Sequence, residues 1–230
     1  TQYGEKYHDK LDAAPYKVTA NLPNGRGVYS FCMCPGGYVV NASSEENRLA
    51  VNGMSYSDRG SSNANSAIIV SVTPEDFNGN DALCGVRFQR DLEAKAYALG
   101  NGKIPQQLFK DYCDNKASTG YGDFSSETKG ANTFTNLRGL LTKDMEQSFI
   151  DGMHSFARHI PGFDRDDAIL SGIESRTSSP IRMNRDKTFQ SNISGIYPCG
   201  EGAGYAGGIT SAAMDGMKVA EAIIQKYQAF

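Results

Sequence analysis

The segment "GEGAGYAGG" at residues 200–208 holds five glycines in nine positions. Within it, Gly202, Gly204 and Gly207 spell G-x-G-x-x-G, the fingerprint of a turn that binds the pyrophosphate of a dinucleotide. Such a turn lies between a strand and a helix, because the helix N-terminus supplies unpaired N–H groups and the positive end of the helix dipole. The sequence around this segment therefore decides which fold the glycines belong to.

The neighbouring residues predict the expected elements but not a complete nucleotide-binding unit. Residues 193–198 read as a strand and residues 209–227 as a helix. A full fingerprint also needs a second strand with an acidic residue about 20 positions on, to hold the ribose. Only 23 residues follow Gly207, and the helix takes up most of them. Two interpretations remain: the glycines allow close packing of strand and helix, or they form one wall of a cofactor site whose main nucleotide-binding unit lies elsewhere.

The overall composition is that of an ordinary soluble globular protein. The 230 residues are 39% hydrophobic and 21% charged, with a net charge of −3. This charge gives no electrostatic reason to bind nucleic acid or an anionic membrane. No apolar run approaches the roughly 20 residues that span a bilayer. Five cysteines, an odd number, indicate reduced thiols and a cytoplasmic location rather than a disulfide framework.

The chain as a whole predicts an α+β fold, in which an antiparallel β-sheet packs with helices. The first third contains short runs rich in Val, Tyr, Phe and Thr that are typical of strands. Pro35-Gly36-Gly37 predicts a hairpin between strands 27–34 and 37–42. The polar stretch 52–66 reads as a long loop, which is either functional or a surface excursion.

The middle and the end of the chain predict helices. Apolar spacing favours a helix over about 83–99, a short helix that begins at Pro105, and a stronger helix that follows the N-cap Thr142 and stops before Pro161-Gly162. The final helix, 209–227, has an apolar stripe made of Ile209, Ala212, Ala213, Met217, Ala220, Ile224 and Tyr227.

Cys32 and Cys34 lie two residues apart on a predicted strand, so both side chains point to one face. Their Cα atoms would lie about 6.5 Å apart, near the upper limit for a disulfide. A metal would need two further ligands, and no second closely spaced cysteine pair supplies them. The alternatives are small apolar residues in a strand core, a metal-binding pair, or redox-active thiols.

Four blocks of the sequence together carry a family resemblance. They are "SFCMCPGGYVVNAS" (30–43), "VNGMSYSDRGSSNANSA" (51–67), "PGFDRDDAILSGIESRTSSPIR" (161–182) and "SGIYPCGEGAGYAGGITSAAMDGMKVAEAI" (194–223). The last block resembles the C-terminal segment of bacterial FAD-dependent dehydrogenases related to the glutathione-reductase-type flavoproteins, and the other three look like blocks of the same family.

The resemblance implies that FAD is the cofactor and that the glycine loop completes its site. In such flavoproteins a C-terminal strand, loop and helix return to the FAD-binding domain, and a Gly-Asp pair in that loop holds a ribityl hydroxyl. Gly200 and Glu201 match this pair, with Glu in place of the usual Asp. The helix N-terminus at Gly207, Gly208 and Ile209 would then face the flavin's pyrimidine edge or the pyrophosphate.

The resemblance also implies candidate contacts outside the loop. Arg176 and Arg182 would bind an anionic substrate or stabilise a reduced, anionic flavin. The alternative is that both arginines are solvated or pair with Glu174 or Asp186. The remaining candidate contacts to substrate or flavin are Asn63, Asn65 and Cys199.

The first 60 residues contain no G-x-G-x-x-G after a strand, and the chain begins at Thr1. We therefore expect residues 1–190 to be a substrate domain and residues 191–230 to be the return segment of an FAD-binding domain. The missing N-terminal region of the same protein would be the main partner, and alone this chain would bind FAD weakly or not at all. The predicted function is flavin-mediated hydride or electron transfer with a small-molecule substrate. The alternatives are a non-enzymatic module that binds a ligand or partner, and a metal-binding protein built around Cys32 and Cys34.

Overall fold

The structure is a computed structural model that describes residues 17–30 and 32–227. It divides into two compact units, which we call the first and the second unit. The first unit comprises residues 1–72 and 95–173, and the second comprises residues 73–94 and 174–230. The helix α1 (Cys84–Gly100) therefore contributes its beginning to the second unit and its end to the first.

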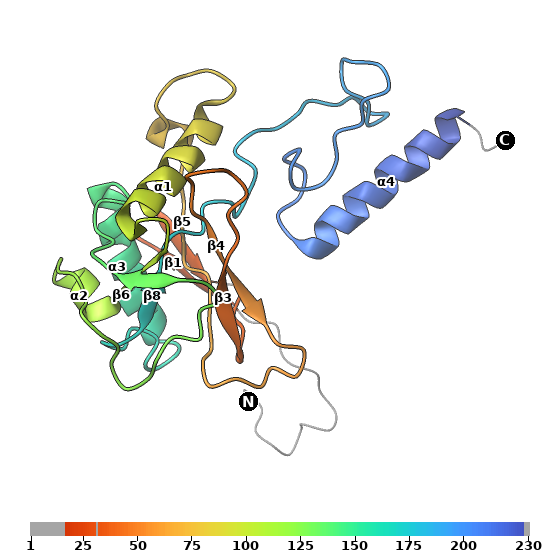
Figure 1. Ribbon diagram of the computed structural model, residues 1–230. Coiled ribbons are helices and arrows are strands. Elements are labelled where there is room, and N and C mark those ends of the chain that lie inside the picture. The colour runs from red at the N-terminus through yellow and green to blue at the C-terminus, as the bar shows by residue number, and fades with distance from the viewer. Residues whose placement is uncertain (1–16, 31, 228–230) are drawn as a thin grey trace. The chain divides into compact units, whose positions relative to one another are not determined.

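One part of the first unit is a small antiparallel sheet covered by a helix. The strands β1 (Val18–Asn21), β2 (Gly27–Ser30) and β5 (Ile69–Val70) lie in the order β1-β2-β5. The helix α3 (Lys143–Ala157) packs against all three strands. Figure 1 shows α3 beside β1 and β5. Burial of apolar side chains between helix and sheet builds a core cluster made of Ala20, Val28 and Phe156.

The helix α3 confirms its prediction from the sequence. The Thr142 hydroxyl accepts a hydrogen bond from the Met145 N–H at 3.3 Å, so the N-cap is the expected one. Gly152 lies on the buried face, and a Cβ atom built there would lie 2.5 Å from Cγ1 of Val28. The absence of a side chain at Gly152 therefore sets how closely α3 approaches the sheet.

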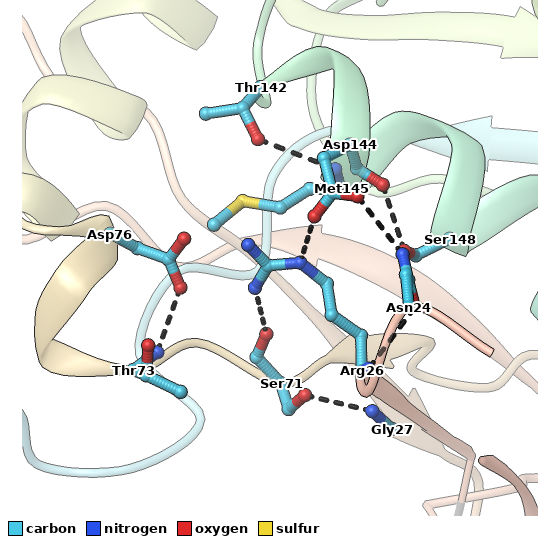
Figure 2. A network of polar contacts seen from close by, with 10 residues as sticks. All are labelled: Asn24, Arg26, Gly27, Ser71, Thr73, Asp76, Thr142, Asp144, Met145 and Ser148. Atoms are coloured by element: carbon cyan, nitrogen blue, oxygen red, sulfur yellow. Dashed lines mark hydrogen bonds and ion pairs between the residues drawn. The ribbon is translucent and has the colours of Figure 1, made fainter. Parts of the chain in front are cut away.

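A polar network ties the turn between β1 and β2 to α3 (Figure 2). The Asn24 amide donates to Asp144 at 3.0 Å and to the Ser148 hydroxyl at 2.9 Å. Arg26 forms an ion pair with Asp144 and donates to the Ser71 carbonyl at 2.9 Å. Because these contacts join residues far apart in the sequence, they fix the turn, the strand β5 end and the helix start to one another.

The other part of the first unit contains a hairpin and a mixed sheet. The strands β3 (Gly37–Asn41) and β4 (Val51–Ser55) pair antiparallel. The strand β6 (Ile104–Leu108) pairs in parallel with β7 (Asn132–Phe134) and antiparallel with β8 (Ile169–Ser171). The helix α2 (Phe109–Cys113) follows β6 directly. The apolar core of this part is a cluster made of Leu49, Val51, Ala96, Ile104, Tyr112, Leu137 and Leu140.

The second unit has few regular elements. It contains the 3-10 turn η2 (Pro74–Asp76), the beginning of α1, irregular chain over 174–208, and the helix α4 (Ile209–Tyr227). The helices α1 and α4 were both expected from the sequence, and both are confirmed within a residue or two. The fold class is α+β with antiparallel sheets and helices, as predicted.

Four elements predicted from the sequence are wrong. The predicted loop 52–66 begins too early, because residues 52–55 belong to β4 and pair with β3. The strand β2 ends at Ser30 and pairs with β1 and β5, so the hairpin 27–34/37–42 does not form. Residues 104–108 are the strand β6 rather than the start of a helix, because pairing with β7 and β8 outweighs the local signal of Pro105. In the described part of the chain, residues 193–198 have no strand partner; they contain a turn at 194–195 and are otherwise irregular, so the glycine loop follows irregular chain.

The described helices include none that is long and apolar enough to cross a membrane.

Candidate functional site

The glycine-rich segment 200–208 forms a tight loop that leads into α4. The Gly204 N–H donates to the Glu201 carbonyl at 2.8 Å, and the Tyr205 N–H donates to the Gly200 carbonyl at 3.0 Å. Gly200 and Gly204 have φ of +71° and +82°, in the region that favours glycine. A Cβ atom at Gly204 would lie 2.4 Å from the Ile181 carbonyl oxygen, so this glycine also permits close approach of another backbone segment.

An ion pair holds the loop to α4. The Arg185 guanidinium donates to both carboxylate oxygens of Asp215, at 2.9 and 2.6 Å. The same guanidinium donates to the Pro198 carbonyl at 2.9 Å, and the Asp215 carboxylate accepts the Gly200 N–H at 2.9 Å. Hydrogen bonding to Arg185 lowers the pKa of Asp215 to about 2. The stabilisation from this carboxylate is thus present above its ordinary pKa of 3.8 and is lost as pH falls through about 2.

The ring of Tyr205 lies against two guanidinium groups. Arg185 lies 3.5 Å and Arg182 4.3 Å from the ring centroid. The Tyr205 hydroxyl donates to the Met183 carbonyl at 2.9 Å, and the Met183 N–H donates to the Ala203 carbonyl at 3.1 Å. Arg185 is neutralised by a carboxylate, whereas Arg182 forms no ion pair with the described residues. The loop therefore carries an exposed cation beside its glycines.

The end of the loop is open. Gly207, Gly208 and Ile209 are exposed, and a Cβ atom at Gly202 or Gly207 would meet nothing within 4 Å. The first N–H groups of a helix have no partners within the helix and point outward along its axis. The Glu201 carboxylate makes no hydrogen bond or ion pair to the residues that the structure describes. The arrangement offers N–H donors, a carboxylate acceptor and a cation around one open backbone turn.

Arg176 is held by Glu93 of α1. Its guanidinium contacts the Glu93 carboxylate at 2.7 and 2.9 Å, and the Ser175 hydroxyl donates to the same carboxylate at 2.6 Å. Glu93 is buried, while the Arg176 side chain is 43% exposed. Burial raises the pKa of the Glu174 carboxyl, with no offsetting effect from a cation. The acidic partner of Arg176 is therefore Glu93, a residue distant in sequence, and not Glu174.

We expect Glu93→Gln to lower the free energy of unfolding of the chain by about 2 kcal/mol, because the neutral amide no longer compensates the Arg176 charge. Urea denaturation followed by circular dichroism measures this change. Glu221→Gln, at an exposed position on α4, is the matched control and should change stability by less than about 0.5 kcal/mol. Equal stability of the two variants would show that the Glu93–Arg176 pair contributes little.

The remaining candidate contacts lie in different places. Cys199 is exposed and precedes Gly200 in the second unit. Asn63 and Asn65 belong to the first unit, where the amide of Asn63 donates to the Ser125 carbonyl at 2.7 Å and that of Asn65 to the Met54 carbonyl at 3.0 Å. The structure therefore brings Cys199, Arg182 and the glycines together in one unit, and gives both asparagine amides backbone carbonyl partners within the first unit.

Cys32 and Cys34 do not lie in a strand core. The strand β2 ends at Ser30, Cys32 is exposed, and the Cys34 backbone forms a bridge with Asn65. The prediction that both thiols face one side of a strand is wrong, because the chain leaves the sheet before it reaches them. Within residues 17–30 and 32–227, no group of three or more His, Cys, Asp or Glu side chains is arranged to hold a metal ion.

Sequence reasoning missed the residues that shape the loop. Arg185, Tyr205 and Asp215 surround the glycines, and Glu93 holds Arg176. Arg185 and Asp215 lie 30 positions apart, so no short motif joins them. The available signal was Asp215 itself, a carboxylate within an otherwise largely apolar stretch of the final helix.

Comparison with known proteins identifies the family. Residues 1–177 match the family described as FAD-dependent protein, C-terminal domain-like. The chain belongs to this family. The match covers the first unit and ends before the glycine loop, which lies in the remaining 53 residues of the 230. The name of the family associates it with FAD and with the C-terminal part of its proteins.

A protein of Clostridium beijerinckii of uncharacterised function is 49% identical over 231 residues. The alignment covers 98% of this chain but 43% of the relative, so the chain spans less than half of that relative's length. The aligned region extends past the family match and takes in most of the second unit.

The residues of the loop fit the chemistry of FAD. The cofactor carries an anionic pyrophosphate, ribityl hydroxyls and carbonyl oxygens on its ring, which need N–H donors, an acceptor and positive potential. Gly202 and Gly207 leave the backbone open, since a side chain at either position would meet nothing within 4 Å. The loop can thus approach a flat or anionic group with its main chain.

Proposed function

We propose that this chain is the C-terminal portion of an FAD-dependent oxidoreductase, a dehydrogenase of the glutathione-reductase-like flavoproteins, acting on a small-molecule substrate. The observation that carries the proposal is an open, clamped glycine loop at the N-terminus of α4 in a chain of an FAD-dependent family. When bound, FAD supplies the hydride or electron transfer. The residues of this chain bind and orient it.

Each part of the loop has a proposed role. The backbone N–H groups at Gly207, Gly208 and Ile209 donate to the pyrimidine edge of the flavin or to the pyrophosphate, supported by the dipole of α4. Glu201 accepts a hydrogen bond from a ribityl hydroxyl, a role supported by its carboxylate having no partner among the described residues. The turn leaves room for the cofactor because it has no side chains at Gly200, Gly202 and Gly204.

Arg182 is the proposed contact for negative charge. It lies beside the loop on the Tyr205 ring and carries no ion pair with described residues, so its charge is available to a phosphate, an anionic substrate or a reduced flavin. The charge of Arg176 is already paired with Glu93, so we propose a smaller role for it, in which the exposed part of its side chain contacts a ligand. Cys199, next to Gly200, is a proposed flavin neighbour.

The helix α4 supports a proposal for the rest of the protein. Its side chains Ile209, Met214, Met217, Ile224 and Tyr227 are each more than half exposed, and Val219 is buried. An apolar stripe of this kind normally packs against another element. We propose that the N-terminal FAD-binding region of the same protein covers it, with residues 191–230 as its return segment and residues 1–190 as the substrate domain. Five free cysteines fit a cytoplasmic protein.

The visible absorption spectrum of the protein expressed from its complete gene tests this function. We expect a yellow protein with flavin bands that releases FAD on denaturation, and a colourless 230-residue chain purified alongside it. A complete protein that is colourless and takes up no added FAD would contradict the flavin assignment. It would favour a non-enzymatic module that binds a ligand or partner.

A further inference from the structure

We infer that Arg185 and Asp215 are positioning residues that fix the glycine loop in the conformation that receives the cofactor. The inference rests on the proposed function, and it names residues that the resemblance does not mark. Neither residue needs to touch FAD for this role. They act through the backbone of Pro198, Gly200 and the residues that follow.

The Arg185–Asp215 ion pair, which we call the clamp, contacts the loop and the residues before it at three points. Asp215 accepts the Gly200 N–H at 2.9 Å, Arg185 donates to the Pro198 carbonyl at 2.9 Å, and the Arg185 guanidinium lies 3.5 Å from the Tyr205 ring centroid. Both charged side chains are largely buried, with exposed fractions of 10% and 12%. These contacts fix Pro198, Gly200 and Tyr205 to Asp215 of α4 through Arg185 or directly.

The nearly buried Arg185–Asp215 pair can hold its two segments in a defined orientation. A bidentate guanidinium–carboxylate pair has a fixed planar geometry, which transmits the position of one element to another. Five of the nine loop residues have no side chain that could hold the loop in place: Gly200, Gly202, Gly204, Gly207 and Gly208. Without the clamp, the entropy of these glycines favours many conformations of which few present the N–H groups together.

The test uses the protein from the complete gene, with Asp215→Asn, Arg185→Lys and the control Glu221→Gln. We expect Asp215→Asn to weaken FAD binding about tenfold or more, and Arg185→Lys to weaken it comparably, because a lysine keeps the charge but not the fork. The double variant, Asp215→Asn with Arg185→Lys, should lose about as much FAD affinity as either single variant. Asp215→Glu, which restores the carboxylate, should recover part of the affinity, and Glu221→Gln should leave it unchanged.

Amide hydrogen exchange over residues 199–205, measured without FAD, separates the outcomes. Faster exchange over residues 199–205 in Asp215→Asn, with unchanged exchange in the first unit, supports the clamp. Unchanged exchange and unchanged FAD affinity in both Asp215→Asn and Arg185→Lys would overturn the inference. If the unaltered protein binds no FAD, the proposed function fails, and the exchange measurement still reports whether Arg185 and Asp215 fix the loop. Arg185→Lys, the milder change, replaces Asp215→Asn if the latter does not fold.

Discussion

Gly204→Ala should disrupt the glycine loop and lower the free energy of unfolding of the second unit by about 3 kcal/mol. The new Cβ would lie 2.4 Å from the Ile181 carbonyl oxygen and 3.0 Å from Cα of Arg182, both of them backbone atoms. Alanine would also have to adopt φ near +82°, which L-residues rarely do. Chemical denaturation followed by circular dichroism, together with limited proteolysis between residues 198 and 208, measures the effect.

Gly202→Ala is the matched control, two residues away in the same loop. A Cβ there would meet nothing within 4 Å, and its φ lies outside the left-handed region. We expect a change of less than about 0.5 kcal/mol in stability. Equal behaviour of the two variants would show that the approach of residues 181–182 to the loop is not what the structure describes.

Gly152→Ala should destabilise the first unit by about 3 kcal/mol. The added methyl group would lie 2.5 Å from Cγ1 and 2.7 Å from Cβ of Val28, in the interface between α3 and β2. The clash outweighs the gain in helix propensity, which is about 1 kcal/mol for glycine to alanine. The midpoint of thermal unfolding, followed by far-ultraviolet circular dichroism, provides the measurement.

Gly216→Ala isolates the propensity term because Gly216 also lies within a helix, α4, but has open space around it. It should stabilise the chain by about 0.5–1 kcal/mol. Opposite signs for the two helical glycines are the expected result. A stabilising Gly152→Ala would mean that α3 packs further from β2 than the structure shows.

The elements that the sequence predicts correctly are those with strong local signals. The helix α3 has a threonine cap and apolar residues at helical spacing, and α4 follows a run of glycines. Both signals act within a few residues, so tertiary contacts are not needed to see them. The α+β class follows from these helices and from the strand-rich first third.

The errors arise where distant residues decide the structure. Pro105 looks like a helix start, yet the mixed sheet formed with β7 and β8 makes it part of β6. The sequence at Gly36 and Gly37 looks like a hairpin turn. A Cβ at either position would lie about 2 Å from a backbone carbonyl oxygen, so these glycines instead allow the backbone near Met54 and Arg59 to come close. The apolar stripe of α4 was read correctly, but its exposure could not be seen from its own spacing.

In the candidate site, too, the sequence predicts what depends on local properties and misses what depends on distant residues. The glycines and Glu201 were visible in the sequence, because backbone freedom and acidity are local properties. The Arg185–Asp215 clamp and the Glu93–Arg176 pair join positions 30 and 83 residues apart, which one sequence cannot reveal. Arg182 was a candidate from its position, and the structure adds the Tyr205 ring that holds it.

Amide hydrogen exchange of the complete gene product, with and without FAD, tests whether the glycine loop binds the cofactor. We expect FAD to slow exchange of the backbone N–H groups over residues 200–211, at the loop and the first turn of α4. Protein that binds FAD while these amides exchange at the same rate in both conditions would contradict it. The glycine loop would then serve only to pack α4 against its neighbours.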